Sequence, residues 1–194
     1  IARALMPNDY GLVGMIAIFI AISQMLIDSG FLSALVQKKD TDNTDYSTIF
    51  WFNIVLSIVL YLLLFAFAGT IARFYNQPIL VKITRISSFG IILSSLCVVQ
   101  VSMILKNFQF KRQAAINFAS ALTSGAAGVF LAYNGYGVWA LVFMSLAGGT
   151  VRVVLFWIIN KWRPKFIFNL QSFKSLYNFG YKIFLQDLGD VFVR

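Results

Sequence analysis

Residues 137–165 read GVWALVFMSLAGGTVRVVLFWIINKWRPK, and this stretch decides the fold class. From Val138 to Ile159 the sequence carries one charge, that of Arg152. At 1.5 Å per residue, a helix over this run measures roughly 33 Å, which matches the roughly 30 Å hydrocarbon core of a bilayer. Trp162 and three cations follow it, and such residues are typical of the cytoplasmic membrane boundary. The stretch therefore predicts a membrane-spanning helix with a cation inside it.

The composition extends this prediction to the whole chain. Of the 194 residues, 59% are hydrophobic and 12% are charged, and the mean hydropathy is +0.79. Soluble domains have about 45–50% apolar and about 25% charged residues, so this chain cannot cover a surface that faces water. We expect an all-α integral membrane protein, a polytopic helical bundle. The net charge of +9 does not indicate nucleic-acid binding, because the cations lie in short clusters between apolar runs.

Several kinds of chemistry lack the residues that they need. The sequence has no His and no Glu, and Cys97 is its one cysteine. It shows no metal-ligand spacing, no nucleophile paired with a base and no glycine loop that would cradle a phosphate. We therefore expect no metal and no cofactor, and an enzyme is disfavoured for this stretch.

The apolar runs predict five complete spans, at about residues 10–36, 46–72, 83–105, 114–132 and 138–159. Residues 1–6 resemble the tail of an earlier span, so we interpret the chain as a fragment of a longer protein. Residues 166–178 are shorter and mixed in character, as expected for an interfacial segment. A further span is expected to start at residues 180–194. The turn at residues 133–137 is short, which predicts that the two spans around it are antiparallel neighbours.

The cations are distributed unequally between alternate links. One set of links carries nine of them: Lys38, Lys39, Lys106, Lys111, Arg112, Lys161, Arg163, Lys165 and Lys174. The other set carries four: Arg3, Arg73, Lys82 and Arg85. The positive-inside rule assigns the first set to the cytoplasm. The last three cations of the second set are either solvated anchors or a rim that attracts anions.

Two charged residues inside spans are candidates for a substrate pathway. Arg152 either lines a cavity and attracts an anion, or it snorkels toward the boundary or joins a structural ion pair, because a cation at this depth is costly. Asp28 either marks a helix break, with its carboxylate hydrated or paired to Lys38 or Lys39, or it couples transport to a proton or cation.

Other candidates are polar residues in apolar surroundings. Asn53 is an interior polar group of the second span. The residues Lys182, Gln186, Asp190 and Arg194 recur every four positions, with Asp187 beside them. This stripe lines an aqueous path or an intramolecular contact. The third span has a hydroxylated face within about 120°, which serves packing or a pathway: Thr84, Ser87, Ser88, Ser94, Ser95 and Ser102. Ser120, Ser124, Gly128 and Ala132 of the fourth span predict close helix packing.

Several strings in order resemble a known family of transporters. They are IARALMPNDYGLVGM at residues 1–15, DSGFLSALVQK at 28–38, TIFWFN at 48–53, IARFY at 71–75, GYGVWALV at 135–142 and NFGYK at 178–182. Together they resemble the Wzx-type polysaccharide flippases, which belong to the multidrug/oligosaccharidyl-lipid/polysaccharide exporter superfamily. The resemblance implies that residues 1–194 form part of the N-terminal half of a MATE-like transporter.

The resemblance also implies a function. The expected substrate is a lipid-linked oligosaccharide with a diphosphate, which crosses the bacterial inner membrane by alternating access for the synthesis of O-antigen, capsule or exopolysaccharide. The expected partners are this substrate, the bilayer, a polysaccharide polymerase and glycosyltransferases, with no nucleic acid among them. Two alternatives are a cation-coupled drug antiporter of the same superfamily and a membrane glycan polymerase or ligase. The antiporter needs acidic cavity residues, and the enzyme needs large periplasmic loops.

Overall fold

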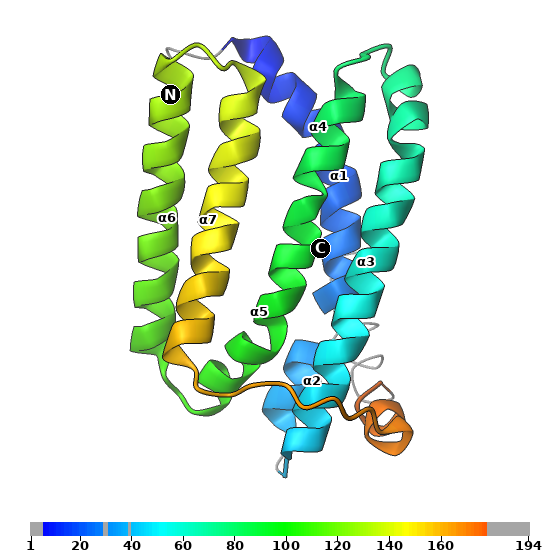
Figure 1. Cartoon of the computed structure of the whole chain (residues 1–194), viewed down its shortest axis with the longest axis vertical. Helices are drawn as coiled ribbons and strands as arrows, with labels where there is room; N and C mark the ends of the chain where they lie inside the picture. Colours follow the sequence, from blue (N-terminus) through cyan, green and yellow to red (C-terminus); the bar gives the residue numbers. More distant parts are fainter. Residues whose placement is uncertain (1–5, 29–30, 39, 178–194) are drawn as a thin grey trace, which may run out of the picture.

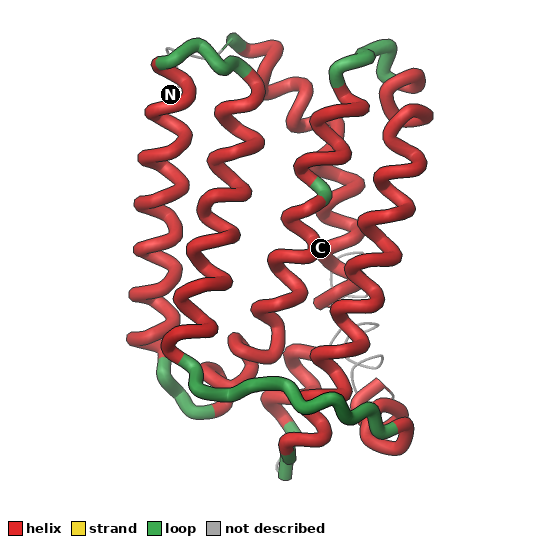
Figure 2. Tube along the Cα trace, viewed as in Figure 1, coloured by secondary structure: helices red, strands yellow, loops and turns green. Residues whose placement is uncertain are grey.

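The computed structural model describes residues 6–28, 31–38 and 40–177 of the chain (Figures 1 and 2). In these ranges the chain forms helices joined by turns and loops, and it forms no strand. The helices are α1 (Pro7–Asp28), α2 (Phe31–Gln37), α3 (Asn43–Phe74), α4 (Leu80–Ser87), α5 (Phe89–Lys106), α6 (Phe110–Tyr133) and α7 (Val138–Ile159). Residues 170–177 are also helical.

Five helical stretches of the described chain are long and apolar enough to cross a membrane: Pro7–Gln37, Asn43–Phe74, Leu80–Lys106, Phe110–Tyr133 and Val138–Ile159. Large apolar side chains on their outer faces are exposed, among them Leu62 at 56% and Phe118 at 67%. In lipid, unlike in water, such exposure has no hydrophobic cost. The described part of the chain is therefore an all-α, multi-pass membrane protein.

The span expected at residues 83–105 consists of two helices, α4 and α5, and the described residues of the span expected at 10–36 lie in α1 and α2. Between α4 and α5, the Ser88 hydroxyl donates to the Thr84 carbonyl oxygen at 2.6 Å. The apolar pattern alone does not reveal such a division of a span.

The helices run alternately up and down, so their links gather at two ends (Figure 1). We call one end the basic end, where the start of α3, the α5–α6 link and the end of α7 lie. Of the described cations it holds Lys38, Lys106, Lys111, Arg112, Lys161, Arg163, Lys165 and Lys174. The opposite end holds the α3–α4 and α6–α7 links. The charge rule assigns the basic end to the cytoplasm.

α6 packs most extensively against α7, as the short turn between them predicts. Small residues allow the two backbones to approach: a Cβ atom on Gly148 would lie 2.9 Å from the Cβ atom of Ser124. The Ser124 hydroxyl donates to the Met144 carbonyl oxygen at 2.9 Å, which adds a polar contact between the helices. In the turn, Gly135 and Gly137 have positive φ angles of 78° and 50°, which favour glycine. The small-residue pattern of α6 is thus confirmed as a packing motif.

At the basic end, the segment after α7 lies across the first turns of α3 (Figure 1). We call residues 160–169 the strap. The Lys165 carbonyl oxygen accepts from Trp51 Nε1 at 2.9 Å, and the Lys165 amide donates to Ser47 Oγ at 3.1 Å. The Asn169 amide donates to Thr48 Oγ1 at 3.1 Å, and Phe166 stacks on Trp51 at 4.8 Å. The expected interfacial segment therefore begins as an extended strap fixed to α3, and becomes helical at residue 170.

The α2–α3 link is held by charges and a helix cap. The Asp42 carboxylate accepts from the Asp45 amide at 2.8 Å, and the Asp45 carboxylate pairs with Lys38 at 2.5 Å. Lys106 Nζ donates to the Lys38 carbonyl oxygen at 2.5 Å and also to Thr41 Oγ1. The hydrogen bond from the Asp45 backbone lowers the pKa of Asp42 below its ordinary value of 3.8. This link therefore fixes the ends of α2, α3 and α5 relative to one another.

The close approach of α6 and α7 makes Gly148 sensitive to size. We expect Gly148→Leu to lower the free energy of unfolding by about 1–3 kcal/mol, because the new side chain must push against Ser124. Gly125→Leu is the matched control, since a Cβ atom there meets nothing within 4 Å. Thermal unfolding of both purified variants in detergent measures the difference. Equal melting temperatures would contradict this account of the interface.

The Asp42 cap predicts a pH dependence. Because the folded pKa lies below 3.8, the cap contributes fully above that pH, and its contribution is lost as the pH falls through the folded pKa. We expect Asp42→Ala to cost about 1 kcal/mol at pH 7 and progressively less below pH 3.8. Asp42→Asn, which can still cap, is the control and should cost less at pH 7. A cost of Asp42→Ala that did not change with pH would count against this role.

Candidate functional site

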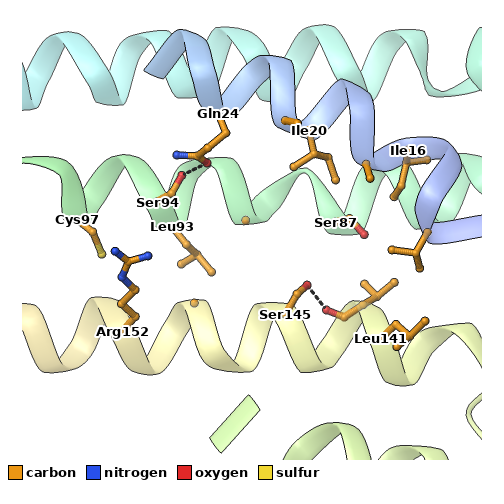
Figure 3. Close-up of a pocket in the computed structure, with 16 residues that line it drawn as sticks. Ile16, Ile20, Gln24, Ser87, Leu93, Ser94, Cys97, Leu141, Ser145 and Arg152 are labelled. Carbon is orange, nitrogen blue, oxygen red and sulfur yellow. Dashed lines mark hydrogen bonds between the residues drawn. The ribbon is translucent and has the colours of Figure 1, made fainter. Parts of the chain in front are cut away.

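Helices α1, α5 and α7 line a partly open cavity of about 460 Å³ (Figure 3). Ser87 of α4 also contributes to its lining. On α7 the lining extends from Leu141 to Arg152, or roughly 16 Å along the helix axis. The volume falls within the roughly 300–1,000 Å³ that small-molecule sites occupy. A cavity of this size between membrane-spanning helices can hold a ligand group of moderate size.

Two helices line the cavity with small or polar residues spaced by four and then three positions. These are Gly90, Ser94 and Cys97 on α5, and Ser145, Gly149 and Arg152 on α7. Residues with this spacing share one face of a helix. The two stripes therefore form opposite walls of the cavity, and α1 contributes a third wall that is mostly apolar.

Gly90 and Gly149 have no side chain that would fill the cavity, and each lies near a leucine of a neighbouring helix. A Cβ atom on Gly149 would lie 3.4 Å from Leu93 Cδ1, and one on Gly90 would lie 3.8 Å from Leu146 Cδ2. A longer side chain at either position would therefore extend into the cavity or displace these leucines. The volume of the cavity depends on the smallness of these two residues.

Gln24, Ser94 and Arg152 lie toward one end of the cavity, and Ser87 and Ser145 lie farther along it (Figure 3). Ser94 Oγ donates to Gln24 Oε1 at 2.7 Å and so links α5 to α1. The Arg152 side chain extends from α7 toward Cys97 of α5, near this pair (Figure 3). Val13 and Leu141 lie toward the other end of the lining. The cavity is amphipathic, with its cation at the end nearer the basic end of the bundle.

Apolar packing lies beyond Arg152 toward the basic end. Phe156, Ile104 and Ile116 are each at most 1% exposed and form one cluster with Cys97. The Arg152 guanidinium carbon lies 5.7 Å from the centroid of the Phe156 ring, within the range of a cation–π contact. This cluster lies between the cavity and the basic end, and its Phe156 ring contacts the Arg152 guanidinium.

Arg152 has no carboxylate partner within the ranges that the structure describes. Their one ion pair is Lys38–Asp45, and no Asp or Glu lines the cavity. The side chain is exposed, so it keeps access to water or to a ligand. A cation between apolar walls attracts an anion strongly, because charge interactions strengthen as the local dielectric constant falls. In the described residues no three His, Cys, Asp or Glu side chains are placed to hold a metal ion.

Of the other residues singled out from the sequence, Asn53 is not among those that line this cavity. Asn53 is fully buried on α3, and its amide has no hydrogen-bond partner in the described chain. Asp28 is the last residue of α1, one turn beyond Gln24. Lys182, Gln186, Asp187, Asp190 and Arg194 lie outside the described residues.

The cavity contains residues that the sequence pattern did not single out. Gln24 and Cys97 carry no signal of their own, and the spacing of Ser145 and Gly149 is of the kind that favours close helix packing. The hydroxylated face of the third span is divided: Ser87 and Ser94 line the cavity, whereas Ser95 donates to Ser57 Oγ of α3 at 3.0 Å. The spacing of Gly90, Ser94 and Cys97 was the signal that could have located the α5 wall.

Comparisons with known proteins agree on one kind of relative. A family model described as polysaccharide biosynthesis protein matches residues 1–194. The succinoglycan biosynthesis transport protein ExoT of Rhizobium meliloti is 26% identical over 93% of this chain and 37% of its own length. The teichuronic acid biosynthesis protein TuaB of Bacillus subtilis is 31% identical over 81% of this chain and 33% of its own length.

A third relative has the same pattern. The lipopolysaccharide biosynthesis protein WzxC of Escherichia coli is 23% identical over 93% of this chain and 37% of its own length. The chain thus spans about a third of the length of these curated relatives. No solved structure matches the chain.

The cavity predicts a difference between two adjacent serines. In a Cys97→Ser background, we expect Ser94→Cys to react with a water-soluble thiol reagent many times faster than Ser95→Cys, because position 94 lines the cavity and position 95 is fully buried against α3. Adding Gly149→Leu should slow labelling at position 94 by filling the cavity. Labelling rates in membranes measure this. Equal rates at positions 94 and 95 would refute the assigned faces of α5.

Proposed function

We propose that this chain, which belongs to the polysaccharide biosynthesis protein family, serves to transport lipid-linked oligosaccharides across the bacterial inner membrane. The name of the Rhizobium relative includes transport, and the names of all three relatives include the biosynthesis of a polysaccharide or a related surface polymer. The proposed substrate is an oligosaccharide repeat unit on a lipid diphosphate, destined for a surface polysaccharide. The proposed role is transport, with no catalytic step.

The observation that carries this proposal is a cation without a carboxylate partner among the described residues, in an amphipathic cavity between membrane-spanning helices. A lipid-linked oligosaccharide combines a diphosphate, sugar hydroxyls and an apolar tail. Arg152 supplies a guanidinium whose planar donors match phosphate oxygens. Gln24, Ser94 and Ser145 supply polar groups along the same walls, which suit hydroxyls. We assign the diphosphate and the adjoining sugar to the cavity, while the tail remains in lipid.

The position of Arg152 suits a carrier that opens alternately to the two sides. Arg152 precedes the end of α7 by seven residues, or roughly 10 Å. The cluster of Phe156, Ile104 and Ile116 lies between it and the basic end. Rocking of one helix bundle against another would open this side and close the other around a fixed binding site. The cation would hold the diphosphate at that site during the change.

The cavity charge favours this function over export of cationic drugs. A drug antiporter needs carboxylates where the cation binds, whereas the charged residue among the described residues that line the cavity is Arg152. A polysaccharide polymerase and glycosyltransferases are the proposed partners, since they would consume and supply the substrate.

The test is the loss of the guanidinium charge. We expect Arg152→Gln to reduce glycan export about ten-fold or more, because a charge-assisted hydrogen bond contributes about 1.5–3 kcal/mol. Arg152→Lys should retain part of the activity, and Lys161→Gln, which removes an exposed cation outside the cavity, should retain nearly all. Surface polysaccharide, measured at equal protein levels in the membrane, is the readout. Normal export by Arg152→Gln would remove this residue from the mechanism.

A further inference from the structure

The basic end has many more cations than anions. Between Asp45 and the last described residue, Tyr177, the sequence contains no Asp and no Glu. Asp45 itself is paired with Lys38. The cations of the α5–α6 link therefore have no carboxylate within their own part of the chain. Asp40 and Asp42 of the α2–α3 link also lie at this end, but Lys111 and Arg112 form no ion pair within the described residues, so their charge is available to an anion from outside the protein.

The α5–α6 link forms a hollow of about 550 Å³, lined by Phe108, Gln109, Phe110, Lys111 and Arg112. Phe108 and Phe110 are 79% and 54% exposed, and both cations are exposed. Arg112 donates to Gln109 Oε1 at 2.8 Å, which holds the guanidinium beside the hollow. Cations next to a membrane-spanning helix are typical of the cytoplasmic boundary, and the exposed Phe rings beside them are apolar surface that lipid can cover.

Lys111 continues an exposed apolar face of α6. At 100° per residue, Phe118, Leu122 and Val129 lie within about 20° of the direction of Lys111. These three side chains are 67%, 58% and 42% exposed. The opposite side of α6, with Ser124 and Gly128, packs on α7. The face from Lys111 to Val129 is therefore unpartnered in the described chain.

The dimensions of this face match one phospholipid. Leu122 follows Lys111 by eleven residues, or roughly 16 Å, which is about half of the roughly 30 Å hydrocarbon core. A headgroup at Lys111 and Arg112 would thus place an acyl chain along Phe118 and Leu122. Ala114 and Ala115 lie between them and leave room for the chain at the headgroup end.

We infer that the α5–α6 link and the outer face of α6 bind an anionic phospholipid of the leaflet at the basic end. Two cations and no nearby carboxylate on the same segment select a negative headgroup over a zwitterionic one. The cations stand in the first turn of α6, where the helix dipole opposes them, so they do not stabilise the helix itself. A phosphate between them would relieve this repulsion. This inference does not depend on the proposed function.

The experiment is native mass spectrometry of the protein purified from membranes in a mild detergent and titrated with phosphatidylglycerol. We expect the double variant K111Q/R112Q to bind the first phosphatidylglycerol about five-fold or more weakly, given the strength of one cation at a membrane surface. The matched control is K161Q/K174Q, which removes the same charge from exposed positions outside the hollow. It should bind phosphatidylglycerol like the unaltered protein.

Three further measurements decide the occupant. Phosphatidylethanolamine should bind more weakly than phosphatidylglycerol to the unaltered protein, and equal binding would overturn the inference. Phosphatidylglycerol with a photoreactive acyl chain should label the segment around Phe118 and Leu122, and labelling confined to other helices would overturn it. A polyprenyl diphosphate that displaced phosphatidylglycerol from this site at a lower concentration would assign the site to the transported substrate instead. Equal weakening in both double variants would show a general charge effect and refute a specific site.

Discussion

Close approach of helix backbones is the constraint on which this structure depends. Lipid is as apolar as leucine, so it gives the helices no hydrophobic reason to associate, and contact must come from tight packing and polar bonds. Gly148 and Ser124 bring α7 against α6 in this way. The same kind of residue has the opposite effect on the adjacent face of α7. There Gly149 and Ser145 line a cavity, because α1 and α5 do not fill the space in front of them.

Polar groups inside the bundle follow a second constraint, since a buried polar group without a hydrogen-bond partner is costly, and Asn53 is an exception in the described chain. Most hydroxyls of the described helices bond back to the preceding turn, as Ser88 does to Thr84. Ser94 and Ser95 do so too, and in addition Ser94 reaches α1 through Gln24 and Ser95 reaches α3 through Ser57. Hydroxyls at two adjacent positions of α5 thus join α5 to two different helices.

Charge separates the two regions to which we assign ligands. Arg152 lies between membrane-spanning helices, where a low dielectric constant screens its field only weakly. Lys111 and Arg112 lie at the boundary, where water and salt weaken each charge and only a cluster distinguishes one headgroup from another. The strap contacts α3 through hydrogen bonds between uncharged groups and through ring stacking. It joins the end of α7 to α3 without occupying either charged region.

The sequence by itself determined the fold class, the approximate positions of the spans and the concentration of cations at one end. These follow from the length of the apolar runs and from the cost of a charge in hydrocarbon, and both are local properties. It also indicated that Arg152 is a cation inside a membrane-spanning helix, which is costly without a partner or access to water. Only the tertiary structure decided which polar residues line the same cavity as Arg152. Gln24, Ser94 and Cys97 come from two other helices. On α5, Ser94 faces the cavity, whereas the next residue, Ser95, faces α3. Such a difference depends on how each helix is rotated, and rotation is set by packing against neighbours. The strap was beyond prediction for the same reason, because its partners Ser47 and Thr48 lie more than 100 residues away in the chain.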